Sequence, residues 1–339
     1  MKILAVGDPH CKVGTIGEVL RLQDEILRHV SDHDVDMCVV LGDLHDTFEK
    51  AHVLAFNTIV DFLKIISTRV PTVYVVGNHD MVNNSGFLHE NHFFKAMKLW
   101  DKTKYNLTVI DSPTMIEGFL FCPYVPAGQM MDAVGSVPGW MKAKAVFCHQ
   151  EFIGAKMGAI ISKHGDEWPK DYPLAVSGHI HTYDRLADNI LYVGSPYMTG
   201  YGDTGTKTVS LLAFSDDDWR EERLSVDVPK KVTMHISLDD VADVEIPQDG
   251  STVRIKIEGT AAALSAFKKT AKFKDMSEKA KVICTPTDST EISSGLQRQS
   301  YVGLLRKACE QESDMVKDLF EKINNTSVDV SSKKSSVKT

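Results

Sequence analysis

Five short apolar segments of this 339-residue chain are each followed by acidic, histidine or asparagine side chains. In chain order these motifs are Gly7-Asp8-Pro9-His10, Gly42-Asp43-Leu44-His45-Asp46, Gly77-Asn78-His79-Asp80, Cys148-His149 and Gly178-His179-Ile180-His181. Carboxylate, imidazole and amide oxygen together are the ligand set of borderline divalent metal ions. Each motif alone is a weak signal, but five of them in succession at the ends of apolar segments favour a metal centre.

Seven of these side chains are candidate metal ligands, and none is a thiolate: Asp8, His10, Asp43, Asn78, His149, His179 and His181. Seven ligands are too many for one tetrahedral ion, and they suit two ions about 3.5–4 Å apart that share one carboxylate. The Asp-x-His and His-x-His spacings put both side chains on one face of an extended segment, which suits chelation of one ion. Such a pair of ions binds phosphate oxygens and activates water, so the predicted chemistry is hydrolysis at phosphorus.

The apolar segments that position these groups alternate with helical patterns at residues 16–30 and 53–66. The expected strands are Lys2–Val6, Met37–Leu41, Thr72–Val76, Leu107–Ile110, Phe119–Phe121, Ala145–Cys148, Leu174–Val176 and Ile190–Val193. Fully apolar runs separated by helices predict an α/β fold whose sheet is covered on both faces, with its later half antiparallel or mixed. The carboxyl ends of such strands line the ligand-binding crevice. A glycine precedes four of the polar groups and is expected to let the backbone turn sharply there.

These five motifs resemble the pattern of the calcineurin-like metallophosphoesterase superfamily, across residues 8–181. The resemblance implies a β-sandwich flanked by helices (αββα). It also implies that Asp8, His10, Asp43 and His181 hold one divalent ion, while Asp43, Asn78, His149 and His179 hold the other. By the same resemblance His79 is a catalytic residue that faces the scissile phosphate and protonates the leaving oxygen, and Asp80 orients it.

The remaining histidines carry weaker signals. His45 lies inside a motif but at a variable position, so we do not expect it to bind metal. His89 and His92 follow the third motif closely, and they are candidates for the lining of the substrate cleft. His29, like the other histidines away from the strand ends, is expected at the surface or in packing.

Two further features distinguish branches of the superfamily. The second motif continues Asp46-Thr47-Phe48, without the Arg-Gly of calcineurin-type protein phosphatases. Tyr192-Val193-Gly194-Ser195-Pro196 resembles the Tyr-x-Gly-Ser-Pro element of SbcD-type nuclease subunits. That resemblance implies a manganese-dependent DNA exonuclease or endonuclease, a homodimer that works with an SbcC-type ATPase in DNA repair and recombination, and the short chain favours the phage branch. The alternatives are a small-molecule or cyclic-nucleotide phosphodiesterase, and a scaffold without turnover.

Composition and patterning predict the organisation of the chain. The expected parts are a phosphoesterase domain at 1–228, a small α+β capping domain at 229–294, an ATPase-binding helix at 295–325 and a disordered tail at 326–339.

The formal net charge of −8 means that bulk charge cannot hold DNA, so metal ions or a partner must supply positive charge. The six cysteines form no C-x-x-C pair, and no apolar run approaches the ~20 residues of a membrane span, so we expect a cytoplasmic protein.

Overall fold

The structure is a computed structural model that describes residues 1–48, 50–158, 160–203, 205–216 and 218–288. Its contacts divide the chain into two units. The first consists of Met1–His235, Asp243–Lys256 and Asp275–Ile283; the second consists of Ile236–Ala242, Ile257–Lys274 and the chain from Cys284 on. The expected ATPase-binding helix at 295–325 and the expected tail at 326–339 lie outside the described residues.

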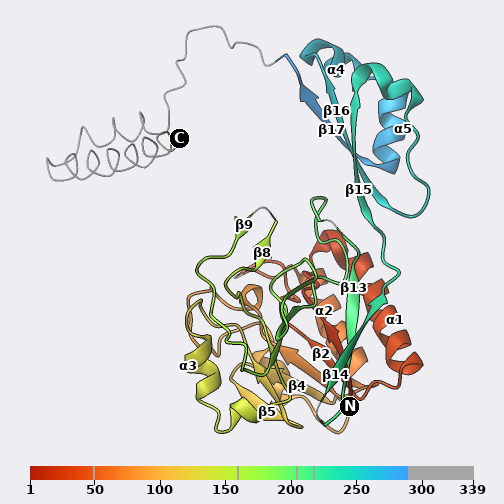
Figure 1. The fold of residues 1–339 in the computed structure, drawn as a ribbon. Helices are drawn as coiled ribbons and strands as arrows, with labels where there is room; N and C mark the ends of the chain where they lie inside the picture. Colours follow the sequence, from red (N-terminus) through yellow and green to blue (C-terminus); the bar gives the residue numbers. More distant parts are fainter. Residues whose placement is uncertain (49, 159, 204, 217, 289–339) are drawn as a thin grey trace, which may run out of the picture. The chain divides into compact units, whose positions relative to one another are not determined.

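Two six-stranded sheets form the frame of the first unit. The first sheet has the order β14 (Trp219–Ser225), β13 (Thr208–Phe214), β1 (Lys2–Val6), β2 (Met37–Val40), β3 (Thr72–Val75) and β4 (Leu107–Ile110). The second has the order β11 (Asp184–Ala187), β12 (Ile190–Tyr192), β10 (Leu174–Ser177), β7 (Ala145–Cys148), β6 (Phe119–Cys122) and β5 (Thr114–Ile116). Figure 1 shows the course of the chain through these elements.

Both sheets are mixed, whereas the sequence predicted an antiparallel or mixed arrangement for the later half alone. In the first sheet β1 to β4 are parallel, while β13 and β14 add an antiparallel hairpin at one edge. In the second sheet β6, β7, β10 and β12 are parallel, and the edge strands β5 and β11 are antiparallel to their neighbours. All five motif-bearing strands therefore belong to parallel sets, so each set brings its carboxyl ends to one edge.

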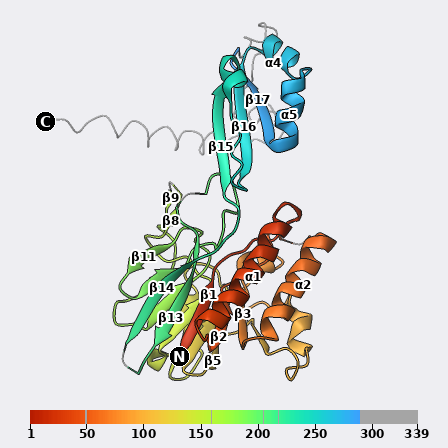
Figure 2. The ribbon, with the colours of Figure 1, turned by 90° about the vertical axis from the view of Figure 1, so that its right-hand side faces the viewer.

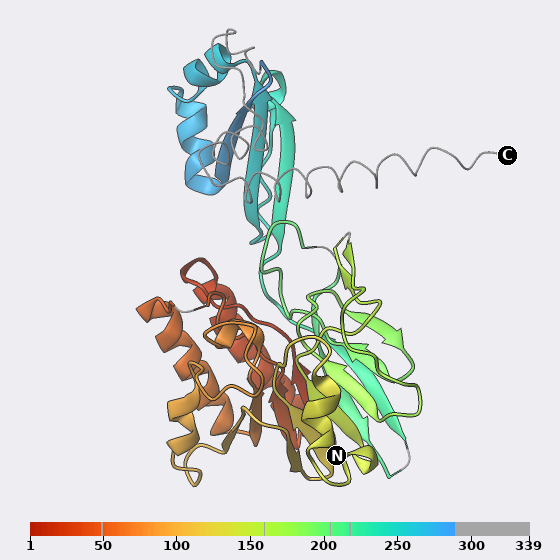
Figure 3. The same cartoon turned by 90° about the vertical axis from the view of Figure 1, so that its left-hand side faces the viewer.

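The alternation of side chains along the strands explains the layers. In β1, Leu4 and Val6 face a core that also contains residues of α1 (Ile16–Asp32) and α2 (Val53–Ser67), while Ile3 and Ala5 face the core between the sheets. Figures 2 and 3 show α1 and α2 together on one side of the first sheet. The outer face of the second sheet packs on a third core that includes α3 (Met130–Gly135). A strand buried on both faces reads as a continuous apolar run, which is why these strands could be predicted.

The rest of the described chain contains smaller elements. A three-stranded sheet is formed by β15 (Lys231–Ser237), β16 (Thr252–Gly259) and β17 (Lys281–Pro286), and a two-stranded hairpin by β8 (Lys156–Met157) and β9 (Ile160–Ile161). Two short helices, α4 (Ala261–Phe267) and α5 (Ala271–Lys279), lie between β16 and β17. The 3-10 turns are Val13–Thr15, Asn78–Asp80, Lys95–Leu99, Trp140–Lys142 and Leu238–Asp243. Across these ranges, no helix has the length and apolar character to span a membrane.

Candidate metal centre

The polar groups that follow five strands come together where the two sheets meet. Asp8 and His10 follow β1, Asp43 follows β2, and Asn78 lies in the turn after β3. His149 follows β7, and His179 with His181 follows β10 in the other sheet. Contacts between side chains of the two sheets place all seven predicted ligands in one cluster.

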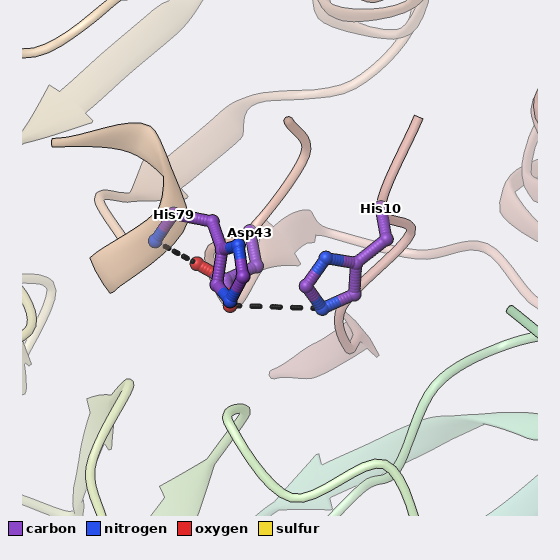
Figure 4. A group of neighbouring side chains, drawn as sticks. All are labelled: His10, Asp43 and His79. Atoms are coloured by element: carbon purple, nitrogen blue, oxygen red, sulfur yellow. Dashed lines mark hydrogen bonds and ion pairs between the residues drawn. The ribbon is translucent and has the colours of Figure 1, made fainter. Parts of the chain in front are cut away.

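Asp43 lies at the middle of this cluster. Its Oδ2 atom is 3.6 Å from His10 Nε2 and 3.3 Å from His149 Nε2, so one carboxylate oxygen faces a histidine from each sheet. Its Oδ1 atom accepts a hydrogen bond of 2.8 Å from the backbone N–H of His79 (Figure 4). Asp43 accordingly belongs to two groups whose ligand atoms lie within 4.8 Å of one another, one with His10 and His79, the other with His149 and His179.

The second of these groups, which contains Asp43, His149 and His179, places several electron-donating atoms close together. His149 donates from Nδ1 to the carbonyl oxygen of Leu41 at 2.6 Å, so in the neutral imidazole the lone pair is on Nε2. That nitrogen is 2.9 Å from Asn78 Oδ1 and 3.2 Å from His179 Nδ1. Burial disfavours a charged His149, but the carboxylates of Asp43 and Asp8 together outweigh burial and raise the pKa of His149 to about 9, so without metal a proton on Nε2 supplies positive charge to this group. A divalent cation can take the place of that proton and bind the lone pair on Nε2.

The first group has the same character. The Nε2 atoms of His10 and His181 face each other at 2.9 Å, and burial lowers the pKa of His10 to about 4. Asp8 is fully buried, and its Oδ1 accepts from the backbone N–H of His179 at 2.8 Å. Its Oδ2 has no hydrogen-bond partner among the described residues. A buried carboxylate oxygen without a partner costs free energy, and bound metal would satisfy it. The donor set therefore fits divalent ions.

The backbone at these positions is strained, which is common at functional sites. His10, Asp43 and His179 have φ angles of 44°, 48° and 72°, in the left-handed region that non-glycine residues rarely occupy. Of the four motif glycines only Gly42, with φ of 94°, uses this region. The other three motif glycines do not use the left-handed region, so the conformational freedom of glycine is not the reason for glycine at those positions.

Close packing explains those other glycines. A Cβ atom on Gly77 would lie 2.3 Å from Asp43 Oδ1, and one on Gly178 would lie 2.3 Å from the carbonyl oxygen of Leu41. A Cβ on Gly7 would lie 2.0 Å from the carbonyl oxygen of Gly194. The loops of the site approach one another too closely for any side chain at these points.

We expect Gly77→Ala to lower metal affinity by about 10–100-fold, the loss typical when the support of a metal ligand is disturbed. The added methyl group would displace the Asp43 carboxylate. Calorimetric titration with Mn²⁺ measures the effect. Gly17→Ala in α1 is the matched control, because its Cβ would meet no atom within 4 Å. Wild-type affinity in Gly77→Ala would show that Asp43 does not need its present position.

The structure corrects the predicted role of Asp80. Its carboxylate accepts hydrogen bonds from the backbone N–H groups of Gly77, Asp43 and His45, at 2.8, 3.0 and 3.2 Å, and from the hydroxyl of Tyr74. None of these hydrogen bonds involves the His79 ring. Burial, with the charge of Asp43, raises the pKa of Asp80 to about 7. Asp80 thus fixes the loop that carries Asp43.

The His79 ring is oriented by Asp46 instead. Its Nδ1 donates to the backbone carbonyl oxygen of Asp46 at 2.8 Å, and Phe48 stacks on the ring with 4.5 Å between centroids. The Asp46 carboxylate pairs with Lys12 at 3.0 Å. Asp46 stood in the second motif, so the sequence contained a signal for it. Tyr74, a hydroxyl in an otherwise apolar strand, carried a weaker one.

The two histidines considered for the substrate cleft have local partners. The His92 side chain is fully buried, and its Nε2 lies 3.3 Å from Asp111 Oδ2, so His92 supports packing. His89 Nδ1 accepts from the backbone N–H of Asn91 at 3.0 Å. His45 Nδ1 donates to the carbonyl oxygen of Thr47, and no ligand group contains it.

The element Tyr192–Pro196 supports the centre from outside. The Tyr192 hydroxyl accepts from the N–H of Phe152 and donates to the carbonyl oxygen of Gln150, beside His149. Ser195 donates from N–H and hydroxyl to the carbonyl oxygen of His181. Lys207 donates to that same carbonyl oxygen at 2.8 Å, a role that no sequence motif indicated.

Two parallel-rich sheets whose joined edge carries carboxylate, imidazole and amide groups define a metal-dependent hydrolase. Residues 1–227 match the calcineurin-like phosphoesterase family, and the chain belongs to that family. Its members use divalent metal ions to hydrolyse phosphate esters.

Two viral proteins agree with this assignment. A protein of Invertebrate iridescent virus 6 named as phosphoesterase 244L is 36% identical over 279 residues, which cover 79% of this chain and 97% of that protein. A protein of Invertebrate iridescent virus 3 named as phosphoesterase 078R is 34% identical over 288 residues and 82% of each chain. The crystal structure of Pseudomonas putida nuclease MPE shares 16% identity at a TM-score of 0.31, over 62% of this chain and 83% of that one.

Proposed function

We propose that this phosphoesterase is a two-metal nuclease that hydrolyses phosphodiester bonds of DNA. The observation that carries the two-metal part is the position of Asp43 Oδ2 between His10 and His149, which come from different sheets. One carboxylate oxygen shared by two groups of ligands is the arrangement of bridged two-ion sites. Asp8, His10, Asp43 and His181 would hold one ion, and Asp43, Asn78, His149 and His179 the other.

The proposed ions are Mn²⁺, as the resemblance to SbcD-type nucleases implies. Ligands of this type without thiolate also suit Mg²⁺, Fe²⁺ and Zn²⁺, and availability selects among these ions. When bound, the ions neutralise phosphate charge and lower the pKa of water at the site. His79 is the proposed general acid. With Nδ1–H bound to the Asp46 carbonyl oxygen, Nε2 is the nitrogen that delivers a proton to the leaving sugar oxygen.

The choice of DNA as substrate rests on the resemblance of Tyr192–Pro196 to the SbcD-type element. Within that family we propose the phage-type branch. The contacts of Ser195 and Tyr192 with the loops of His181 and His149 support a role for this element in positioning ligands. We propose a homodimer bound to an SbcC-type ATPase, with docking through the ATPase-binding helix expected at 295–325. Co-purification with a large coiled-coil ATPase, lost on truncation near residue 300, tests this partner.

Substrate comparison tests the reaction. The full-length protein with Mn²⁺ is incubated with linear duplex DNA, single-stranded DNA, cyclic AMP and bis-p-nitrophenyl phosphate. A nuclease cleaves DNA and the generic diester. Cleavage of cyclic AMP without cleavage of DNA would replace the nuclease with a cyclic-nucleotide phosphodiesterase.

Removal of metal is expected to abolish hydrolysis of bis-p-nitrophenyl phosphate. Excess EDTA strips the ions that neutralise the phosphate, and added Mn²⁺ should restore the rate better than Mg²⁺. The measurement is the initial rate before chelation, after it and after each ion is returned in excess. Full activity in excess EDTA would contradict a metal-dependent mechanism.

A further inference from the structure

The hairpin formed by β8 and β9 exposes large aliphatic side chains. Ile160 and Ile161 are 65% and 57% exposed, and Met157 and Ile153 are also exposed. The two strands pair only with each other, with Lys156 opposite Ile161 and Met157 opposite Ile160 (Figure 1). Successive residues of a strand face opposite sides, so Ile160 with Met157 lies on one face of the hairpin and Ile161 with Lys156 on the other. Exposed aliphatic side chains on both faces favour contact with another molecule.

The root of this hairpin is fixed beside the metal centre. The chain reaches β8 directly from His149, and Phe152 is fully buried with its N–H bound to the Tyr192 hydroxyl at 2.8 Å. Backbone hydrogen bonds of 2.9 and 2.8 Å join Gly154 to Ser162 and Ser162 to Ala155. A rigid root means that the aliphatic side chains keep a set position relative to His149.

A cavity connects the hairpin with two of the proposed ligands. Its volume is about 340 Å³, and its walls include Lys156 and Met157 on one side and His179 and His181 on the other. Lys207 also lines it. This volume is within the roughly 300–1,000 Å³ of small-molecule sites, so the cavity can take one nucleotide. Asp203 lines the cavity as well and pairs with Lys207 at 3.9 Å, so Lys156 on the hairpin is the charge that favours an anionic occupant.

We propose that the β8–β9 hairpin is a wedge that separates the terminal base pair of duplex DNA and directs one strand into the metal centre. This rests on the proposed nuclease function. Ile160 and Ile161 would contact the unstacked bases, as apolar side chains do in proteins that open base steps. Lys156 would contact the backbone phosphate. Continuity of the hairpin with the cavity beside His179 and His181 favours a nucleic acid over a protein occupant.

The test compares wild type, Ile160→Ser/Ile161→Ser and the control Leu99→Ser, which changes an aliphatic side chain that is 89% exposed outside this region. Substrates are a blunt duplex and the same duplex with an unpaired end. The double variant should cleave the blunt duplex at least about tenfold more slowly, because it loses apolar contact with the opened bases. The unpaired end should restore most of the rate. A 2-aminopurine at the duplex terminus, with EDTA to prevent cleavage, should brighten on binding to wild type and less on binding to the variant.

Hydrolysis of bis-p-nitrophenyl phosphate is measured on the same proteins as a control, because it shows whether the metal centre is intact. With that control, each result on DNA has a single interpretation. Equal cleavage of blunt ends by the double variant would overturn the wedge and leave the nuclease standing. An equal loss on blunt and unpaired ends would also overturn it, because the hairpin would then be a general DNA contact. If wild type hydrolyses the generic diester but no DNA, the proposed function fails, and the wedge fails with it.

Discussion

Replacing Asp43 with asparagine is expected to lower phosphodiesterase activity by at least about 10³-fold. The substitution removes the negative charge at the one oxygen that faces His10 and His149, at 3.6 and 3.3 Å. Metal ions contribute several kcal/mol of transition-state stabilisation, and each 1.36 kcal/mol is a factor of ten in rate. Turnover of bis-p-nitrophenyl phosphate and metal content by mass spectrometry are measured on the same sample. Both should fall together.

Asp61→Asn is the matched control, since Asp61 is an exposed residue of α2. It should keep full metal content and full rate. An Asp43→Asn protein that retained both metal content and turnover would remove the basis for a shared carboxylate. If only one of two ions were lost, the metal content by mass spectrometry would show directly that the remaining ligands form a separate site.

Replacing His79 with alanine is expected to slow cleavage of DNA by about 10²–10⁴-fold while the metal content stays the same. The reason is that His79 is proposed to supply a proton to a poor leaving group. p-Nitrophenolate leaves without protonation, so the variant should lose much less activity on bis-p-nitrophenyl phosphate. The ratio of the two rates is the measurement.

The same variant decides whether His79 is itself a ligand, because it lies within reach of the atoms of His10 and Asp43. A ligand role predicts that His79→Ala loses metal and that both substrates slow equally. A proton donor predicts unequal losses at full metal content. His33→Ala is the matched control, because it removes an imidazole at the C-terminal end of α1, outside the candidate metal centre.

The strands and the convergence of the motif side chains could be predicted because both depend on local patterns. Segments such as Lys2–Val6 are buried on both faces and so are apolar throughout. The polar group after each strand then lies at a known edge of its sheet. The expected strands did not include β13 and β14. In β14, Trp219–Ser225 mixes charged and apolar residues at an exposed edge, whereas β13 is a mostly buried apolar run whose pattern did contain a signal.

Contacts between distant loops could not be predicted in the same way. Asp80 follows His79 directly in the sequence, and the family resemblance implied that Asp80 orients the His79 ring. The fold instead turns its carboxylate toward the N–H groups of Asp43 and His45, more than thirty residues away in the chain. The packing role of Gly77 and Gly178 has the same origin, because it depends on how closely other loops approach.

The division of the ligands between two sheets has a consequence for folding. Neither sheet contains a complete ligand set, so high-affinity metal binding requires that the sheets have already docked against each other. Ions that bind only the docked state add their binding free energy to its stability, about 2.7 kcal/mol when free metal is 100 times its dissociation constant. Bound metal would thus stabilise the docked sheets against unfolding. A shortage of metal would lower the fraction of folded protein as well as the catalytic rate.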